Sequence, residues 1–175
     1  MNYFELLGMP EQMELDAAVL SRHYLELQRR FHPDQFGNAS ERDRRQSVQQ
    51  AALINDAFQT LKHPMSRAEY LLELRGVELK HEQQSFQDNS FLMQQMELRE
   101  QLAEIAAAPQ HTDALQQQLE RELAQQQQRL RSELAAAIAE QTADADALAA
   151  ATLRKLKFFD KLEKELGFIE QQRQD

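Results

Sequence analysis

The chain has 175 residues, 42% hydrophobic and 28% charged, which suits one ordinary domain or two small ones. Its four glycines and four prolines are too few for a turn-rich all-β protein. Alanine, leucine, glutamine and glutamate dominate instead and predict an all-α fold. The absence of cysteine excludes disulfides, thiolate-bound iron–sulfur clusters, cysteine zinc sites and thiol catalysis.

The charge and hydropathy patterns exclude further classes. A net charge of −9 argues against general binding of nucleic acids or anionic membranes. No apolar run approaches transmembrane length, and the first residues resemble neither a signal peptide nor a transit peptide. We therefore expect a soluble, intracellular helical protein.

The composition changes near Gly76. Residues 1–76 contain 9 basic and 11 acidic residues, a net charge of −2, and most of the glycines and prolines. Residues 77–175 contain 11 basic and 18 acidic residues, a net charge of −7. This change predicts a domain over 1–76, a linker over 77–87 and a second domain over 88–171.

The first expected helix is short, because the apolar residues from Tyr3 to Leu7 are followed by Gly8. The next helix begins after Asp16, a side chain suited to an N-cap. It ends before Pro33, since proline disfavours helical backbone at the preceding residue. Its apolar residues recur at spacings of four and three and form one stripe, made of Leu20, Tyr24, Leu27 and Phe31.

A polar loop is expected from His32 to about Ser40, and a third helix begins near Glu41. The second and third helices thus predict an antiparallel hairpin with an exposed tip. The third helix ends at His63-Pro64, and a fourth comes directly after it. The third helix is expected to bury Val48, Ala51, Ala52, Leu53, Phe58 and Leu61. The fourth carries the apolar residues Ala68, Tyr70, Leu71, Leu72 and Leu74.

The second domain contains three long periodic segments, whose short connections predict an antiparallel three-helix bundle. The first extends from about Asp88 to Ala107. Asp113 and Asp144 lie near the expected starts of the other two. Their apolar stripes comprise Leu115, Leu119, Leu123, Leu130, Leu134 and Ile138, and then Leu148, Leu156, Phe159, Leu162, Leu166 and Ile169. The run of glutamines at 125–128 is predicted to be a solvated stretch of helix.

The tripeptide His32-Pro33-Asp34 is the first feature that indicates a functional site. One interpretation is structural: proline ends the helix, and Asp34 forms a turn or caps the next segment of the chain. The other depends on the preceding helix, where Arg22 and Arg29 fall opposite the apolar stripe, flanked by Arg30. A cationic helix face that leads into an exposed acidic loop is typical of an electrostatic docking surface.

About the first 75 residues resemble a J domain, the module through which co-chaperones bind DnaK-class ATPase chaperones. The matching features are Tyr3 to Gly8, the arginine-bearing helix ending in Phe31, His32-Pro33-Asp34, and Leu53 to Leu61. The resemblance implies a non-catalytic domain that accelerates ATP hydrolysis by the chaperone. It also implies roles for the residues named above. His32 and Pro33 would shape the loop, Asp34 would pair with a chaperone arginine, and the arginines would attract acidic chaperone surface: Arg22, Arg29 and Arg30.

The whole chain is similar to the HscB family, the co-chaperones of iron–sulfur cluster assembly. The segments that carry this similarity are Met65–Leu72, Phe91–Ile105 and Leu153–Leu162. A general DnaJ-type protein is a poor match, since there is no glycine- and phenylalanine-rich linker and no zinc module. The family implies an L-shaped pair of helical domains, a chaperone partner of the HscA type and a place in the bacterial cytoplasm.

The helix that begins near Asp88 has more apolar surface than one contact uses. Phe91, Leu98, Leu102 and Ile105 form one stripe, sufficient to bury the helix in a bundle. Leu92, Met93 and Met96 lie off that stripe, on the same side as Glu97, Glu100 and Glu104. This second face is either buried within the bundle, a homodimer seam, or an adaptable surface for a partner.

The family resemblance assigns the second face to an IscU-type scaffold, the protein on which iron–sulfur clusters are assembled. Its scaffold-binding pattern matches Leu92, Met93, Met96, Glu97, Glu100, Glu104 and Phe158. The apolar groups would supply burial, and the glutamates would orient basic residues of the partner. The partners would handle ATP and the cluster, so no cofactor and no metal site are expected in this chain.

Other functions remain open. One is a J protein for general unfolded clients, and another is a structural module that dimerises through the second helical face. A hydrolase built on His32 and Asp34 is not expected, because the sequence offers no nucleophile or oxyanion donor pair. A basic run on the last helix is interpreted as a solvated face that complements acidic neighbours, rather than as a nucleic-acid site. It comprises Arg154, Lys155, Lys157, Lys161 and Lys164.

Overall fold

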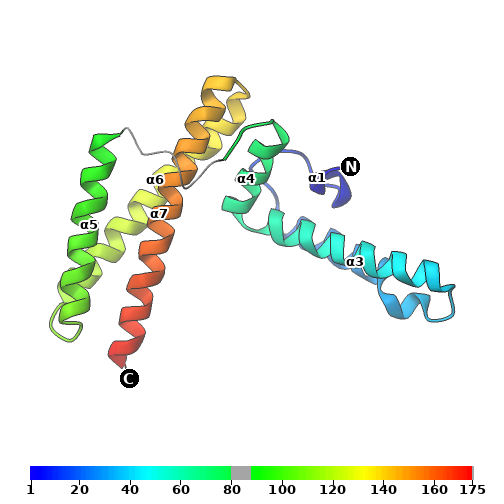
Figure 1. The fold of residues 1–175 in the computed structure, drawn as a ribbon, viewed down its shortest axis with the longest axis horizontal. Coiled ribbons are helices and arrows are strands. Elements are labelled where there is room, and N and C mark those ends of the chain that lie inside the picture. The colour runs from blue at the N-terminus through cyan, green and yellow to red at the C-terminus, as the bar shows by residue number, and fades with distance from the viewer. Residues whose placement is uncertain (80–87, 175) are drawn as a thin grey trace. The chain divides into compact units, whose positions relative to one another are not determined.

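The computed structural model describes residues 1–79 and 88–174, so most of the predicted linker 77–87 lies outside the described residues. The described residues form seven α-helices and one 3₁₀ helix with no strand among them, which confirms the all-α prediction (Figure 1). The chain divides into two compact units. The first consists of Met1–Glu78 with Ile138–Asp146, and the second of Leu79–Ala137 with Ala147–Asp175.

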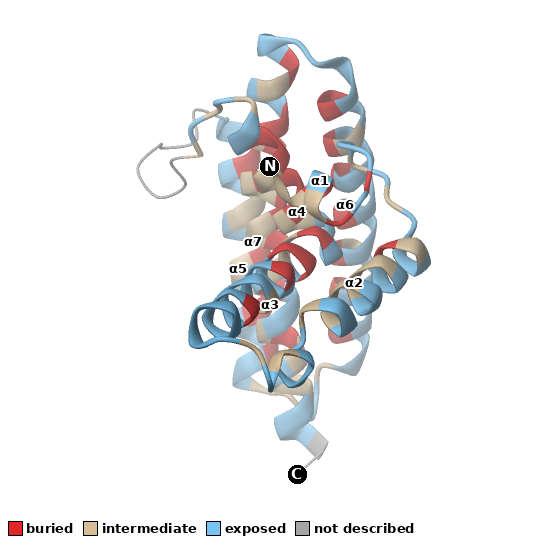
Figure 2. Cartoon of the chain, turned by 90° about the vertical axis from the view of Figure 1, so that its right-hand side faces the viewer, coloured by how far each residue is buried: buried red, intermediate tan, exposed pale blue. Residues whose placement is uncertain are grey.

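The first unit is built around a helical hairpin. Its elements are α1 (Tyr3–Leu6), α2 (Ala17–Phe31), the 3₁₀ helix η1 (Pro33–Phe36), α3 (Glu41–Lys62) and α4 (Pro64–Leu74). Helices α2 and α3 lie side by side, and η1 lies in the loop that joins them. Most residues of α2 and of the first half of α3 are exposed, shown in pale blue in Figure 2.

Local side-chain chemistry fixes the ends of these helices. Asp16 caps α2 as predicted, because its carboxylate accepts from the backbone N–H groups of Ala18 and Val19 at 3.0 and 3.2 Å. Gly8 follows α1 with a φ of +62°, a conformation that favours glycine. His23 joins α2 to that turn, since its Nδ1 lies 2.7 Å from the carbonyl oxygen of Leu7.

Apolar residues from all four helices form the core of this unit. Tyr24 stacks on Phe58 with ring centroids 4.0 Å apart, and Tyr3 stacks on Tyr70 at 4.6 Å. The stacked rings and buried aliphatic groups join α1 to α4 and α2 to α3. The most deeply buried residues are Phe4, Leu7, Leu20, Ile54, Ala57, Leu61, Ala68, Leu71 and Leu72.

The predicted buried face of α3 is partly wrong. Val48 and Leu53 are 55% and 40% exposed, and Ala52 is exposed too. The buried stripe runs through Ser47 and Ile54 instead. In the first half of α3 only a narrow stripe is buried, and both α2 and η1 pack against this helix. Ser47 fits this position because its hydroxyl donates to the carbonyl oxygen of Arg44 at 2.7 Å.

A buried arginine connects the end of α3 to the segment before α2. Arg67 is 8% exposed, and its Nε donates to the carbonyl oxygen of Leu61 at 2.8 Å. Its Nη1 donates to the carbonyl oxygen of Met13 at 2.6 Å. Burial lowers the pKa of the Arg67 guanidinium from its ordinary value. These bonds satisfy the carbonyl groups of Leu61 and Met13, which have no partner in the backbone hydrogen bonds of a helix.

The second unit takes most of its residues from three helices: α5 (Asn89–Ala107), α6 (Asp113–Glu140) and α7 (Ala143–Gln174). Successive helices run in opposite directions, as predicted, so α5 and α7 run in the same direction (Figure 1). Their stripes bury Phe91, Leu98, Leu102, Ile105, Leu119, Leu123, Leu130, Leu134, Leu153, Leu156, Phe159, Leu162 and Leu166. Within the described ranges, none of the helices combines the length and the apolar character needed to cross a membrane.

Two expectations for this unit are wrong. Leu148 is 59% exposed, because the neighbouring Ala149 takes the inward position on α7. Gln127 is 4% exposed, although the sequence predicts a solvated run at 125–128. On α6 the spacings of four and three from Leu123 to Gln127 to Leu130 place this glutamine on the stripe that faces the bundle.

Candidate functional site: two partner-binding surfaces

The hairpin tip presents its acidic residue to solvent. His32 ends α2 in an extended conformation, and Pro33 begins η1. The backbone N–H of Asp34 donates to His32 Nδ1 at 3.2 Å. Asp34 Oδ2 lies 3.5 Å from the same nitrogen, and the Asp34 side chain is 91% exposed. The histidine thus holds the turn while the carboxylate stays accessible.

The arginines of α2 share the exposed side of the hairpin. Arg22, Arg29 and Arg30 are all exposed, whereas the opposite stripe packs toward α3. On that opposite stripe, Tyr24 donates its hydroxyl to Asn55 of α3 at 3.2 Å. The structure therefore brings the predicted residues together as one set, here named the hairpin-tip surface: Arg22, Arg29, Arg30, His32, Pro33 and Asp34.

Sequence reasoning missed an apolar member of this surface. Leu25 is 52% exposed and lies three residues after Arg22 and four before Arg29. At that spacing the three side chains are neighbours on one helix face. The sequence does contain the signal, because Leu25 falls outside the apolar stripe that α2 uses for packing.

Helix α5 exposes the apolar residues that lie off its buried stripe. Leu92, Met93 and Met96 are 47%, 63% and 59% exposed. This exposure contradicts the alternative in which the second face is buried within the bundle. The rest of the predicted face is exposed as well, namely Glu97, Glu100 and Glu104. An apolar patch bordered on one side by carboxylates is typical of a protein-binding surface.

Phe158 of α7 lies against the same helix. It is half-buried, and its ring meets Phe91 edge-on at 5.6 Å between centroids. The guanidinium of Arg99 lies over the Phe158 ring, 5.6 Å from its centroid. These contacts hold Phe158 beside the exposed residues of α5. We name this set the α5 surface: Leu92, Met93, Met96, Glu97, Glu100, Glu104 and Phe158.

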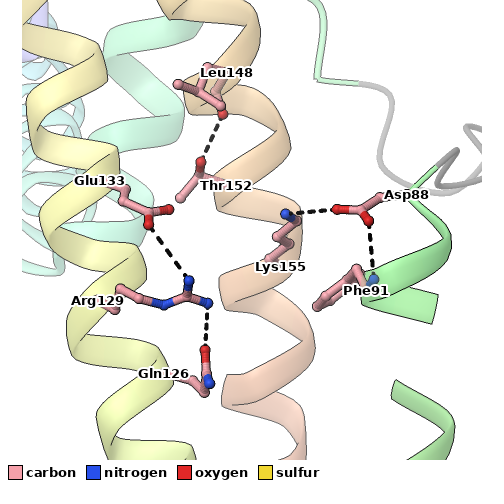
Figure 3. A network of polar contacts seen from close by, with 8 residues as sticks. All are labelled: Asp88, Phe91, Gln126, Arg129, Glu133, Leu148, Thr152 and Lys155. Atoms are coloured by element: carbon pink, nitrogen blue, oxygen red, sulfur yellow. Dashed lines mark hydrogen bonds and ion pairs between the residues drawn. The ribbon is translucent and has the colours of Figure 1, made fainter. Parts of the chain in front are cut away.

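A polar network fixes the first turn of α5 (Figure 3). Asp88 caps the helix by accepting the backbone N–H of Phe91 at 3.1 Å, and it accepts Lys155 Nζ at 3.2 Å. The bond from Phe91, followed by that from Lys155, lowers the pKa of Asp88. The same ammonium lies 5.4 Å from the centroid of the Phe91 ring. The network therefore sets the direction of the turn that carries Leu92 and Met93.

Lys155 shows one acidic neighbour that the basic run of the last helix complements. The sequence does not identify that neighbour, which is Asp88 at the start of α5. Arg99, which the predicted face omits, is likewise engaged, since its Nη1 bonds to Glu165 Oε2 at 2.6 Å. Neither role could be found from spacing within one helix, because both partners belong to another helix.

The chain is similar to known proteins over nearly its whole length. A family described as "HSCB C-terminal oligomerisation domain" matches residues 87–167. Two relatives named "Co-chaperone protein HscB homolog" match nearly the whole chain. The one from Vibrio cholerae serotype O1 (strain M66-2) is 51% identical over 98% of both chains. The one from Vibrio parahaemolyticus is 48% identical over 97% of both chains.

Solved structures give the same result. The structure titled "Chaperone HscB from Vibrio cholerae" matches with a TM-score of 0.89 and 48% identity, over 98% of this chain and 99% of that one. Human co-chaperone protein HscB matches with a TM-score of 0.86 and 30% identity, over 96% of this chain and 81% of that one. The chain therefore belongs to the HscB family of co-chaperones.

Proposed function

We propose that the chain is a non-catalytic adaptor in the maturation of iron–sulfur proteins. It binds an IscU-type scaffold protein, delivers it to a DnaK-class chaperone of the HscA type, and stimulates that chaperone's ATPase. Residues 1–76 act as a J domain, 77–87 as a linker and 88–171 as the scaffold-binding domain. The partners bind ATP and the cluster, and the adaptor acts in the bacterial cytoplasm.

The hairpin-tip surface contacts the chaperone in this proposal. The exposed carboxylate of Asp34 forms a charge-assisted pair with an arginine of the ATPase region. Arg22, Arg29 and Arg30 raise the rate of encounter with an acidic surface and set its orientation. The ring of His32 holds the turn, so that the carboxylate does not reorganise on binding.

The α5 surface contacts the scaffold. Leu92, Met93 and Met96 lose water on binding, which supplies the main stabilisation. Methionine side chains are flexible enough to fit an irregular partner. The glutamates at 97, 100 and 104 pair with basic scaffold residues and fix the register. Phe158 adds an aromatic group held in place by Phe91 and Arg99.

The observation that carries the proposal is the exposure of both sets of residues. Asp34 is 91% exposed at the hairpin tip, and Met93 is 63% exposed on α5. The test uses purified partners. The chain should accelerate single-turnover ATP hydrolysis by an HscA-type chaperone, and the scaffold should increase that effect. If the chain neither binds the scaffold nor changes the rate of hydrolysis, the proposal is wrong.

Self-association through the α5 surface is a second candidate. The name of the matching family includes the word oligomerisation, and an exposed apolar patch of this kind could serve a second copy. Sedimentation equilibrium distinguishes the two functions. A tight dimer that dissociates in Met93→Asp/Met96→Asp would favour self-association, whereas a monomer that binds the scaffold would favour the adaptor.

A further inference from the structure

A groove of about 620 Å³ lies between the second halves of α5 and α7. Its apolar lining comes from Leu102, Ala103 and Ala106 of α5 and from Phe168 and Ile169 of α7. Phe168 is 60% exposed. Phe168, Ala103 and Ala106 thus form an apolar surface that the helices of the bundle leave exposed. None of these five residues belongs to the α5 surface.

The groove is continuous with the α5 surface. Leu92, Met96, Arg99, Ala103 and Ala106 follow one another at spacings of four, three, four and three, which places them on one strip along α5. Helix α7 runs beside this strip in the same direction as α5, and two contacts join the helices along it. Phe91 meets Phe158 at 5.6 Å, and Arg99 meets Glu165 at 2.6 Å. Apart from Arg99, which pairs with Glu165, the strip is apolar, and it extends past Phe158 toward Phe168.

The two sides of the strip carry opposite charges. On the α5 side stand the exposed carboxylates of Glu97, Glu100 and Glu104. On the α7 side stand Lys161 and Lys164, both exposed and both lining the groove. Lys164 forms only a surface pair with Asp160, at 3.3 Å and with 79% of its own side chain exposed, so it remains available to a partner. Arg99 and Glu165 neutralise each other between the two sides.

We propose that the scaffold-binding surface continues through this groove to Phe168 and receives one amphipathic helix of the scaffold. This proposal rests on the proposed function and specifies the partner segment. The helix lays its apolar stripe over Met96, Ala103 and Phe168. Basic residues on one flank face the glutamates of α5, and acidic residues on the other flank face Lys161 and Lys164.

The dimensions agree with such an occupant. The strip from Leu92 to Ala106 spans 14 residue steps, about 21 Å at 1.5 Å per residue. A partner helix of about four turns would cover it. The small side chains of Ala103 and Ala106 allow a close approach of helix backbones, and the exposed Phe168 offers an aromatic contact in the same groove. Opposite charges on the two sides select one orientation of the helix.

The test is isothermal titration of the purified IscU-type scaffold into the full chain. We expect Phe168→Ala to weaken binding about 5- to 20-fold, as for an exposed aromatic contact. We expect Lys161→Glu/Lys164→Glu to weaken it about tenfold at low salt and less at high salt. The matched controls are Leu148→Ala, an exposed leucine elsewhere on α7, and Arg121→Glu/Arg131→Glu on α6. Both controls should bind like the wild type, and circular dichroism should show an unchanged fold for all variants.

The outcomes separate the two proposals. If the wild type binds and Leu92→Ala/Met96→Ala/Phe158→Ala is weakened, but the Phe168 and lysine variants bind normally, the extension through the groove is wrong. If Phe168→Ala leaves scaffold binding intact and instead dissociates a dimer in sedimentation, the groove serves a second copy and the extension is again wrong. If the wild type does not bind the scaffold, the proposed function itself fails.

Discussion

The hairpin-tip surface and the α5 surface differ in the kind of interaction that they offer to a partner. The first is charged, with Asp34 and three arginines exposed at the end and along one face of a helical hairpin. The second is mainly apolar, with Leu92, Met93 and Met96 on a helix packed in a bundle. Exposed charges speed an encounter and are screened by salt, whereas buried apolar area slows dissociation. Under the proposed function, this difference predicts a brief contact with the chaperone and a lasting contact with the scaffold.

The supporting structure shows the same difference. At the hairpin tip, hydrogen bonds within the loop itself hold the turn: the backbone N–H of Asp34 donates to His32 Nδ1 at 3.2 Å, and that of Gln35 donates to the His32 carbonyl oxygen at 2.9 Å. Beneath the α5 surface, Asp88, Lys155 and the phenylalanine rings connect α5 to α7. A surface that acts through one carboxylate needs only that group to be accessible. A surface that acts through area needs several side chains fixed at once.

The largest expected effect comes from Asp34→Asn, which removes the charge and keeps the shape. We expect it to abolish stimulation of the chaperone's ATPase, because loss of one partner of a charged interfacial hydrogen bond costs about 2–5 kcal/mol. Scaffold binding should not change. The control is Asp56→Asn, an exposed carboxylate of α3 outside the surface. Normal stimulation by the Asp34 variant would show that charge at the tip is not what the chaperone recognises.

The reciprocal change is Leu92→Ala/Met96→Ala/Phe158→Ala. It should weaken scaffold binding by about 2–4 kcal/mol, because truncated interface anchors lose burial, and leave stimulation without scaffold intact. Titration calorimetry and single-turnover hydrolysis measure the two quantities separately. Should both fall together in a variant that remains folded, the two surfaces would not act independently.

Arg67→Ala tests whether the units are stable independently. The change leaves the carbonyl groups of Leu61 and Met13 unpaired in a buried place, so we expect a loss of about 1–3 kcal/mol in stability. Thermal unfolding should show a lower transition for the first unit. Stimulation of the ATPase should then fail on mild heating at a temperature where scaffold binding persists. An unchanged unfolding profile would contradict the structural role of Arg67.

The smallest expected effect lies away from both surfaces. A carboxyl–carboxyl hydrogen bond with Glu120, followed by burial, raises the pKa of Glu170 from 4.5 to about 7. Its contribution to stability is therefore full below about pH 4.5 and is lost as the pH rises through about 7. Glu170→Gln keeps the neutral form and should stabilise the protein at pH 8 by less than about 1 kcal/mol, because solvent screens the pair.

Thermal unfolding of Glu170→Gln at pH 5 and pH 8 checks this sign. The midpoint should match that of the wild type at pH 5 and exceed it at pH 8. Glu163→Gln, an exposed carboxyl on the same helix, serves as the control and should show no such pH dependence. A Glu170→Gln midpoint below that of the wild type at pH 8 would mean that the carboxylate is stabilising there.

The sequence predicted features that depend on one helix at a time. Asp16 as a cap, the stop at Pro33 and the exposed second face of α5 all follow from local chemistry and helical spacing. Prediction from the sequence failed where contacts with a neighbouring helix determine which side chains are buried or paired. Ser47 rather than Val48 is buried because α2 covers only a narrow stripe of α3. Lys155 of α7 pairs with Asp88, the N-cap of α5, and the groove beside Phe168 is formed by two helices together.

The central claim is that one chain must carry both surfaces in order to deliver the scaffold. The most direct test mixes the Asp34→Asn variant with the Leu92→Ala/Met96→Ala/Phe158→Ala variant and measures scaffold-dependent stimulation of the chaperone's ATPase. We predict that the mixture gives no more scaffold-dependent stimulation than either variant alone. Restoration of the wild-type rate by the mixture would contradict the claim, because the two contacts would then not need to be joined in one molecule.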